Sequence, residues 1–205
     1  MRYATKRIKR YVAMIGAVGI VMMPIAVPTA VAAGAVSPRA YVQKLVKNAR
    51  MATQIGGENA DSEFSKQFDI SLFSQRCLID HWESLADKQR AEFTDVFSQV
   101  LRRRLDKVVR KSFGGRKFTY VIGNAQSDSD GVIRVSMIAK VDDISIDFGY
   151  FLVHEGQSYK MVDYEIKGVL LSRNYRGHFN YLMRKYGFKG MMEKMHAKKQ
   201  RLAQK

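Results

Sequence analysis

The chain has 205 residues and a formal net charge of +16, from 35 basic and 19 acidic side chains. This length suits one folded domain once any leader is removed. Cys77 is the only cysteine, which excludes an intramolecular disulfide, and we interpret its thiol as a small buried apolar side chain.

The first 33 residues have the three parts of a secretory signal peptide. Residues 1–10 contain five basic side chains and no acidic one. An apolar run covers residues 11–27, and small residues over 28–33 offer a cleavage site. A retained membrane anchor is the alternative, because the run is long enough for a thin bilayer. We therefore predict an exported chain whose single domain, residues 34–205, works outside the cytoplasm.

The next elements to be expected are helices. Pro38 opens a predicted helix that ends near Ile55, before a glycine pair, and a polar loop is predicted over residues 58–66. A second helical region covers residues 68–82. A third helix starts at Ala86, and its apolar stripe follows the helical period through Phe93, Phe97, Val100, Leu101 and Leu105.

After Gly114 and Gly115 the apolar period changes from 3.6 to 2, which predicts strands. Four are expected, over residues 117–123, 133–137, 144–152 and 159–171. A helix over residues 174–186 and a short, methionine-rich, basic tail complete the chain. Helices, an antiparallel sheet of about four strands and further helices together predict an α+β fold.

The mature chain stays basic, at +11, when the five basic residues of the leader are subtracted from +16. Basic side chains gather over residues 102–117 and 184–205, with one acid in each block. An exported chain meets anionic lipid headgroups rather than nucleic acid, so we predict docking to anionic partners or membranes through Arg102, Arg103 and Arg104. The alternative is a solvated face that aids solubility.

Catalytic motifs are missing from the sequence. We find no nucleophile elbow, phosphate-binding loop, zinc-protease motif or paired cysteines, and the four histidines are far apart. We therefore predict no catalytic residue, no metal and no cofactor. Two alternatives stay open: an enzyme that uses Asp147 with His154, or an acid pair from Asp143, Asp147, Asp163 and Glu165, and a structural envelope protein that uses only its basic surface.

Two stretches resemble the MlaC family, also called the toluene-tolerance family, of periplasmic phospholipid-binding proteins. Residues 81–97 contain Trp82 and then Gln89, Phe93 and Phe97 at the family's spacing, and residues 159–179 contain its glycine followed by Asn-Tyr-Arg-x-x-Phe. The similarity extends over residues 38–195. Lys167 and Leu170 depart from the pattern, which has an acid and a serine there.

The resemblance implies a soluble, monomeric periplasmic carrier. It would move phospholipid between an outer-membrane lipoprotein complex and an inner-membrane ABC transporter with a lipid-binding ring subunit, and so maintain outer-membrane lipid asymmetry. A carrier of hopanoids or other apolar lipids is the alternative within the family. No covalent step is needed, which agrees with the missing motifs.

We predict that the cargo lies in an apolar cavity between the sheet and the helices, although the same side chains would also suit an ordinary core. The residues predicted to bind lipid are Val135, Met137, Ile144, Ile146, Phe148, Val162, Tyr164 and Ile166 in the sheet, with Phe93, Phe97, Leu101, Tyr175 and Phe179 in the helices.

Overall fold

The computed structural model describes residues 36–55, 68–113 and 118–204. Contacts divide the chain into two units, Met1–Ala35 and Val36–Lys205, and the second holds every element described. The predicted export signal and the predicted loop over residues 58–66 lie outside the described residues. Within the described ranges, no helix combines the length and the apolar character needed to cross a bilayer.

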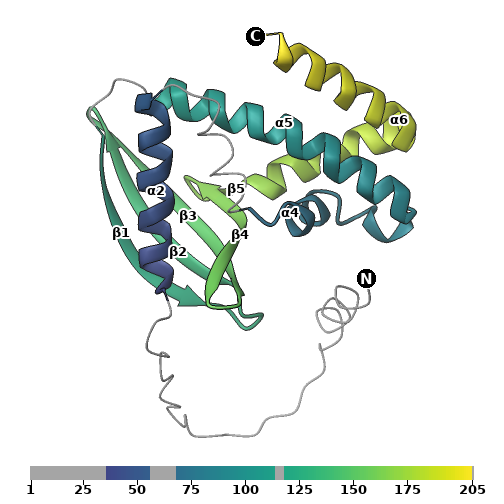
Figure 1. The fold of residues 1–205 in the computed structure, drawn as a ribbon. Coiled ribbons are helices and arrows are strands. Elements are labelled where there is room, and N and C mark those ends of the chain that lie inside the picture. The colour runs from purple at the N-terminus through teal and green to yellow at the C-terminus, as the bar shows by residue number, and fades with distance from the viewer. Residues whose placement is uncertain (1–35, 56–67, 114–117, 205) are drawn as a thin grey trace, which may run out of the picture. The chain divides into compact units, whose positions relative to one another are not determined.

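The described elements form an α+β fold, as predicted (Figure 1). Helices come first, then an antiparallel sheet of five strands rather than about four, then a long helix. In chain order they are α2 (Pro38–Ile55), α4 (Ile70–Cys77), the 3-10 turn η1 (Trp82–Ser84), α5 (Asp87–Phe113), β1 (Phe118–Ser127), β2 (Ile133–Val141), β3 (Ile144–Glu155), β4 (Ser158–Ile166), β5 (Val169–Leu170) and α6 (Leu171–Ala203).

The sheet is a meander in which each strand pairs with its neighbour in sequence, β1-β2-β3-β4-β5. The pairing of β2 with β3 runs without a shift from Ile133 opposite Leu152 to Val141 opposite Ile144. Because side chains alternate along a strand, this register gives the central strands one continuous apolar face. Its members Val135, Met137 and Phe148 are buried.

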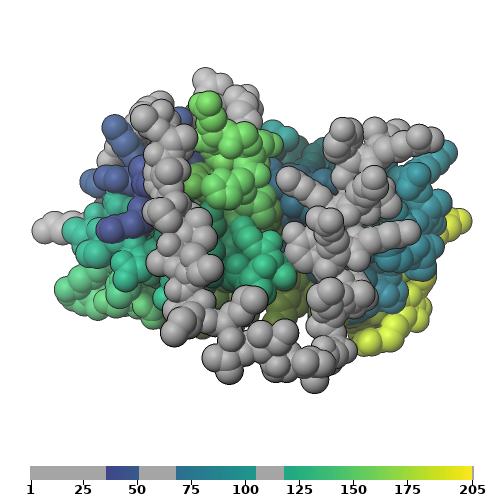
Figure 2. Space-filling model, turned by 90° about the horizontal axis from the view of Figure 1, so that it is seen from below, coloured from purple at the N-terminus to yellow at the C-terminus, as the bar shows by residue number. Residues whose placement is uncertain are grey.

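One apolar cluster joins this inner face of the sheet to the helices. Helix α2 contacts β1, β2 and β4, while α4 and α6 both contact β4. Helix α5 packs on α2, α4 and α6. Figure 2 shows β4, in light green, with α2 in purple-blue on one side and α4 in blue on the other. The inner face of the sheet is therefore the side toward which the helices pack.

The predicted strand over residues 159–171 is wrong in its second half. Lys167 and Gly168 have φ values of 49° and 77°, and they form a two-residue turn that pairs Ile166 with Val169. Positive φ at both central residues is what such a tight hairpin needs. The chain then enters α6 at Leu171, earlier than the predicted helix start at residue 174.

The end predicted for this last helix, at Tyr186, is also wrong. Helix α6 continues to Ala203 across a kink at Gly187, whose φ is 63°. Beyond the kink, Met191, Met192 and Met195 are buried in the core cluster. The methionine-rich segment is therefore part of the core, and it is helical rather than a short tail.

A bulge in β4 breaks the alternation predicted for Val162, Tyr164 and Ile166. Phe151 pairs with Asp163 and Leu152 with Met161, so Val162 has no partner of its own. An extra residue of this kind reverses the side to which the preceding side chains point. As a result Met161 joins the main cluster, while Val162 is buried outside it.

Candidate functional site

Ten of the thirteen predicted lipid-binding residues take part in, or pack against, the cluster between sheet and helices. Seven are buried in it: Val135, Met137, Phe148, Phe93, Phe97, Leu101 and Phe179. Three are half-buried beside it: Ile146, Tyr164 and Tyr175. The others are Val162, buried elsewhere, and Ile144 and Ile166, which are exposed.

The helical side of this cluster is a stack of aromatic rings. Phe93 and Phe97 lie one turn apart on α5, and Tyr175 and Phe179 lie one turn apart on α6. The centroid of Phe97 is 4.9 Å from that of Tyr175 and 5.2 Å from that of Phe179. Spacing of four residues puts each pair on one face of its helix, so the two faces meet ring against ring.

The sheet side carries two tyrosine hydroxyls in an apolar setting. The rings of Tyr150 and Tyr164 are 5.3 Å apart, and the Tyr150 hydroxyl is 3.8 Å from the Sδ atom of Met137. Burial raises the pKa of Tyr150 and raises that of Tyr164 well above its usual range. Both hydroxyls are therefore neutral at physiological pH, and Tyr164 still keeps some accessible surface.

Burial falls along β3 toward its first residue. Phe148 is buried, Ile146 is half-buried and Ile144 is 58% exposed, although the period of two puts all three on the inner face. Ile166, opposite Phe148, and Val169, opposite Ile166, are also exposed. The inner apolar face thus reaches solvent at this end of the sheet.

The three arginines predicted to dock partners do not share one environment. Arg102 is exposed and Arg103 is half-buried. The guanidinium of Arg104 lies 5.7 Å from the ring centroid of Tyr175. Burial raises the pKa of Tyr175, and the charge of Arg104 opposes this rise.

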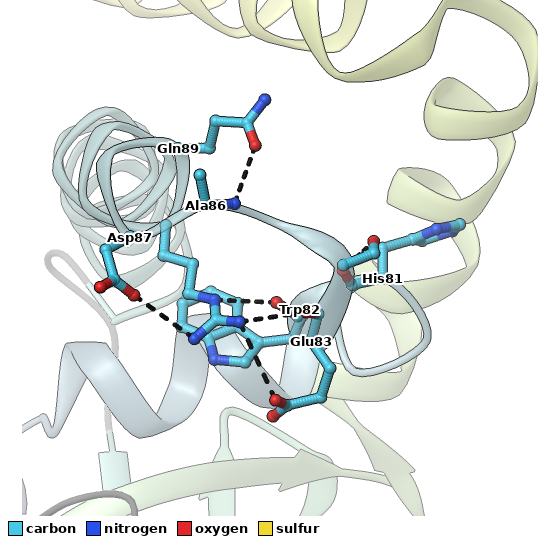
Figure 3. Close-up of polar contacts among 8 residues, drawn as sticks. His81, Trp82, Glu83, Ala86, Asp87 and Gln89 are labelled. Carbon is cyan, nitrogen blue, oxygen red and sulfur yellow. Dashed lines mark hydrogen bonds and ion pairs between the residues drawn. The ribbon is translucent and has the colours of Figure 1, made fainter.

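The first stretch that carries the family resemblance has a structural role (Figure 3). Arg90 Nε donates to the Trp82 carbonyl at 2.9 Å, and its Nη2 atom donates to the Glu83 carbonyl at 3.2 Å. The same guanidinium lies 5.8 Å from the centroid of the Trp82 ring. Gln89 accepts from the Ala86 backbone N–H at 2.9 Å. These contacts fix the entry to α5, and with it the direction of Phe93 and Phe97.

The second stretch fixes the start of α6 in a similar way. Asp163 of β4 is fully buried and accepts from the Ser172 backbone N–H at 3.2 Å and from the Ser172 hydroxyl. Arg176 Nε donates to Asp80 Oδ2 at 2.8 Å, and these bonds lower the pKa of Asp80. Sequence reasoning missed these roles, because Arg176 and Asp80 are 96 residues apart and Asp163 meets Ser172 only after the chain turns back through β5.

The polar residues considered for catalysis do not converge. Asp147 and His154 are seven residues apart on β3, so their side chains point to opposite faces of the sheet. Their Cα atoms are also roughly 23 Å apart along the strand. Glu165 is paired with Arg134 at 2.8 Å, and the Asp163 carboxylate holds α6. Among the residues that the structure describes, no group of three or more His, Cys, Asp or Glu side chains could hold a metal ion.

Comparison with known proteins now identifies the family. The family model described as MlaC protein matches residues 42–197. The chain belongs to the MlaC family. The match extends over most of the chain and includes both structural stretches, which confirms the resemblance found in the sequence.

A solved structure has the same fold as this MlaC-family chain. It is a phospholipid-binding protein from Ralstonia solanacearum in complex with a phospholipid, with a TM-score of 0.69 and 16% sequence identity. The alignment covers 82% of this chain and 99% of that one. No curated protein matches the chain.

Proposed function

We propose that this MlaC-family protein is a carrier that binds a diacyl phospholipid, with its acyl chains between the inner face of the sheet and the helices. The observation that carries the proposal is the family membership together with a same-fold neighbour that holds a phospholipid. The predicted lipid-binding residues support it, since most of them gather in one apolar cluster between these two layers.

Tyr164 supports an internal space beside this cluster. Burial raises the pKa of its hydroxyl well above the usual range, so the group is largely surrounded by protein. The same side chain keeps accessible surface, which a close-packed core would remove. A half-buried side chain at the edge of the apolar cluster would suit the lining of a lipid cavity.

The energetics explain why a carrier needs such a lining. Each methylene exposed to water costs about 0.8 kcal/mol, so roughly thirty methylenes of two acyl chains amount to on the order of 24 kcal/mol. Transfer between membranes forms no covalent bond. We therefore propose a binding protein without catalytic residues, metal or cofactor, and the separation of Asp147 from His154 supports this.

The wider role follows from the family. We propose that the carrier works in the periplasm after signal-peptide cleavage, as a monomer. It would exchange phospholipid with an outer-membrane lipoprotein complex and with an inner-membrane ABC transporter that has a lipid-binding ring subunit, and so maintain outer-membrane lipid asymmetry. A hopanoid carrier of the same fold is the second candidate, because the half-buried aromatic side chains Tyr164 and Tyr175 also suit a rigid apolar ring system.

Environment-sensitive labels can test where the acyl chains lie. Ile144→Cys and Ile138→Cys each add an exposed thiol to an exposed isoleucine position, the first on the inner face of the sheet and the second on the outer face. Native Cys77 is buried, and burial raises the pKa of its thiol, so a bimane label should select the new cysteine. Phosphatidylglycerol vesicles should change the emission at position 144 and leave position 138 unchanged. A change at position 138 alone contradicts the proposed site.

A further inference from the structure

The inner apolar face opens at one identifiable end of the sheet. Phe118 of β1 pairs with Val141 of β2, and Val141 pairs with Ile144 of β3, so these residues form one row across that end. In this row Ile144 is 58% exposed, and Val169, which lies opposite Ile166 and so four residues along β3 from the row, is 56% exposed. Both belong to the inner face by register, so an acyl chain could enter the interior there without crossing a polar layer.

Helix α5 leads to the same end. Its buried side chains include Phe97 and Leu101, and Arg104, three residues after Leu101, is exposed on the same side of the helix. Helix α5 ends at Phe113, and only four residues separate this end from Phe118 in the row just described. Arg104 is nine residues before Phe113, about 14 Å along the helix. Arg104 is therefore an exposed cation beside the ring of Tyr175, which lies six residues after the exposed Val169 in the chain.

Arg104 is positioned by an aromatic ring, and none of the carboxylates that the structure describes pairs with it. It lies over the Tyr175 ring at 5.7 Å from the centroid. Tyr175 is itself held by Phe97, at 4.9 Å between centroids. Among the described residues, no carboxylate lies within ion-pair distance of Arg104. A guanidinium has five N–H donors, so most of them stay available to an anion.

We infer that Arg104, seated on Tyr175, contacts the phosphate of the bound phospholipid's headgroup and makes the carrier prefer phospholipids to lipids without phosphate. This rests on the proposed function. Arg104 then acts in cargo selection, and Arg102, which is also exposed and lies two residues earlier on the same helix, provides the comparison. A planar guanidinium held by an aromatic ring is well suited to a phosphate, because its orientation is already fixed before binding.

The test uses two soluble lipids that share their acyl chains, dioctanoyl phosphatidylglycerol and dioctanoylglycerol, with the delipidated mature protein. Calorimetry should show that Arg104→Gln weakens binding of the phospholipid on the order of tenfold, the usual effect of losing a charged hydrogen bond. Binding of dioctanoylglycerol should stay unchanged. The matched variant Arg102→Gln should change neither affinity, and Arg104→Lys should restore part of the phospholipid affinity.

Other results overturn the inference. Equal weakening of both lipids by Arg104→Gln would assign the arginine to the fold or to acyl-chain contacts. Equal phospholipid affinities of Arg104→Gln and the unmodified protein would show that another group binds the phosphate. Inorganic phosphate that binds alone and is lost in Arg104→Gln would assign the site to the free ion. If the unmodified protein binds neither lipid, the proposed function itself is wrong.

Discussion

At the scale of single residues, Asp163 is the polar side chain on which the connection of the two layers depends. Its carboxylate on β4 accepts from the backbone N–H groups of Tyr164 and Ser172, at 2.8 and 3.2 Å. Arg76 lies 3.8 Å away and Cys77 nearby is neutral, since burial raises the pKa of its thiol. Burial raises the pKa of Asp163, while its hydrogen bonds to Ser172 and Tyr164 oppose that rise.

A raised pKa in the folded state makes stability depend on pH in a defined direction. The folded protein binds this proton more tightly than the unfolded chain, so the stabilisation is full below the ordinary value of 3.8 and is lost as pH rises through the higher folded-state pKa. Asp163→Asn keeps the shape and removes the titration. Urea unfolding should show that the unmodified protein loses stability relative to Asp163→Asn as the pH rises from 3.5 to 7.

Asp147→Asn is the control for this experiment, because it removes an exposed carboxylate from the same sheet. The free energy of unfolding of Asp147→Asn should change with pH in the same way as that of the unmodified protein. A gain in stability of the unmodified protein over Asp163→Asn as pH rises would show that hydrogen bonding outweighs burial at Asp163.

Some residue roles could be predicted from sequence and others could not. Phe93 and Phe97 repeat at the helical period, which is enough to place both on the core face of a helix. Arg90 binds a carbonyl eight residues earlier, and Asp163 binds a serine nine residues later across a turn. Such bonds depend on how two elements meet in space, and no local pattern of residue types encodes them.

At the scale of elements, α6 is the feature that differs most from the sequence prediction. It runs from Leu171 to Ala203 with one non-helical residue, Gly187. Glycine is a common helix terminator, so its presence favoured a helix end near Tyr186. The burial of Met191 and Met195 shows instead that packing on the core continues the helix beyond the kink. The bulge at Val162 is similar, because only the partner strand reveals it.

Two glycines of α6 provide a matched test of this kink. A Cβ atom at Gly187 or at Gly177 would meet nothing within 4 Å, so neither substitution is limited by space. Gly187 has a φ of 63°, and alanine there should destabilise the protein by roughly 1–2 kcal/mol. Gly177 lies within the regular helix, where alanine should stabilise it by about 0.5–1 kcal/mol. Urea unfolding of both variants measures this, and stabilisation by Gly187→Ala would mean that α6 is straight in solution.

At the scale of the whole molecule, the charge of +11 that remains after removal of the predicted leader bears on how the proposed carrier meets its targets. Exposed basic side chains lie along α6, including Arg184, Lys185 and Lys189, and Glu193 is its only acid. Exposed charges are screened beyond about 10 Å at 0.1 M salt, so they speed encounter more than they stabilise a complex.

Reversing charge on α6 should therefore slow delivery without changing loading. Arg184→Glu with Lys189→Glu should reduce the rate of lipid transfer to phosphatidylglycerol-rich acceptor vesicles several-fold at low salt, because attraction to the anionic surface is lost. Glu193→Lys, on the same exposed helix, should increase the rate. Transfer measured with fluorescent phospholipid should converge for all variants at high salt. Unchanged rates at low salt would show that these charges serve solubility alone.

The central claim is that the protein carries a diacyl phospholipid inside the cluster that joins the sheet to the helices. Native mass spectrometry of the gently purified mature protein tests it most directly, with and without prior incubation with phospholipid vesicles. One bound diacyl phospholipid per chain is expected, and fragmentation of the released lipid should give the masses of its two acyl chains. A protein that stays free of lipid after incubation with vesicles would contradict the account.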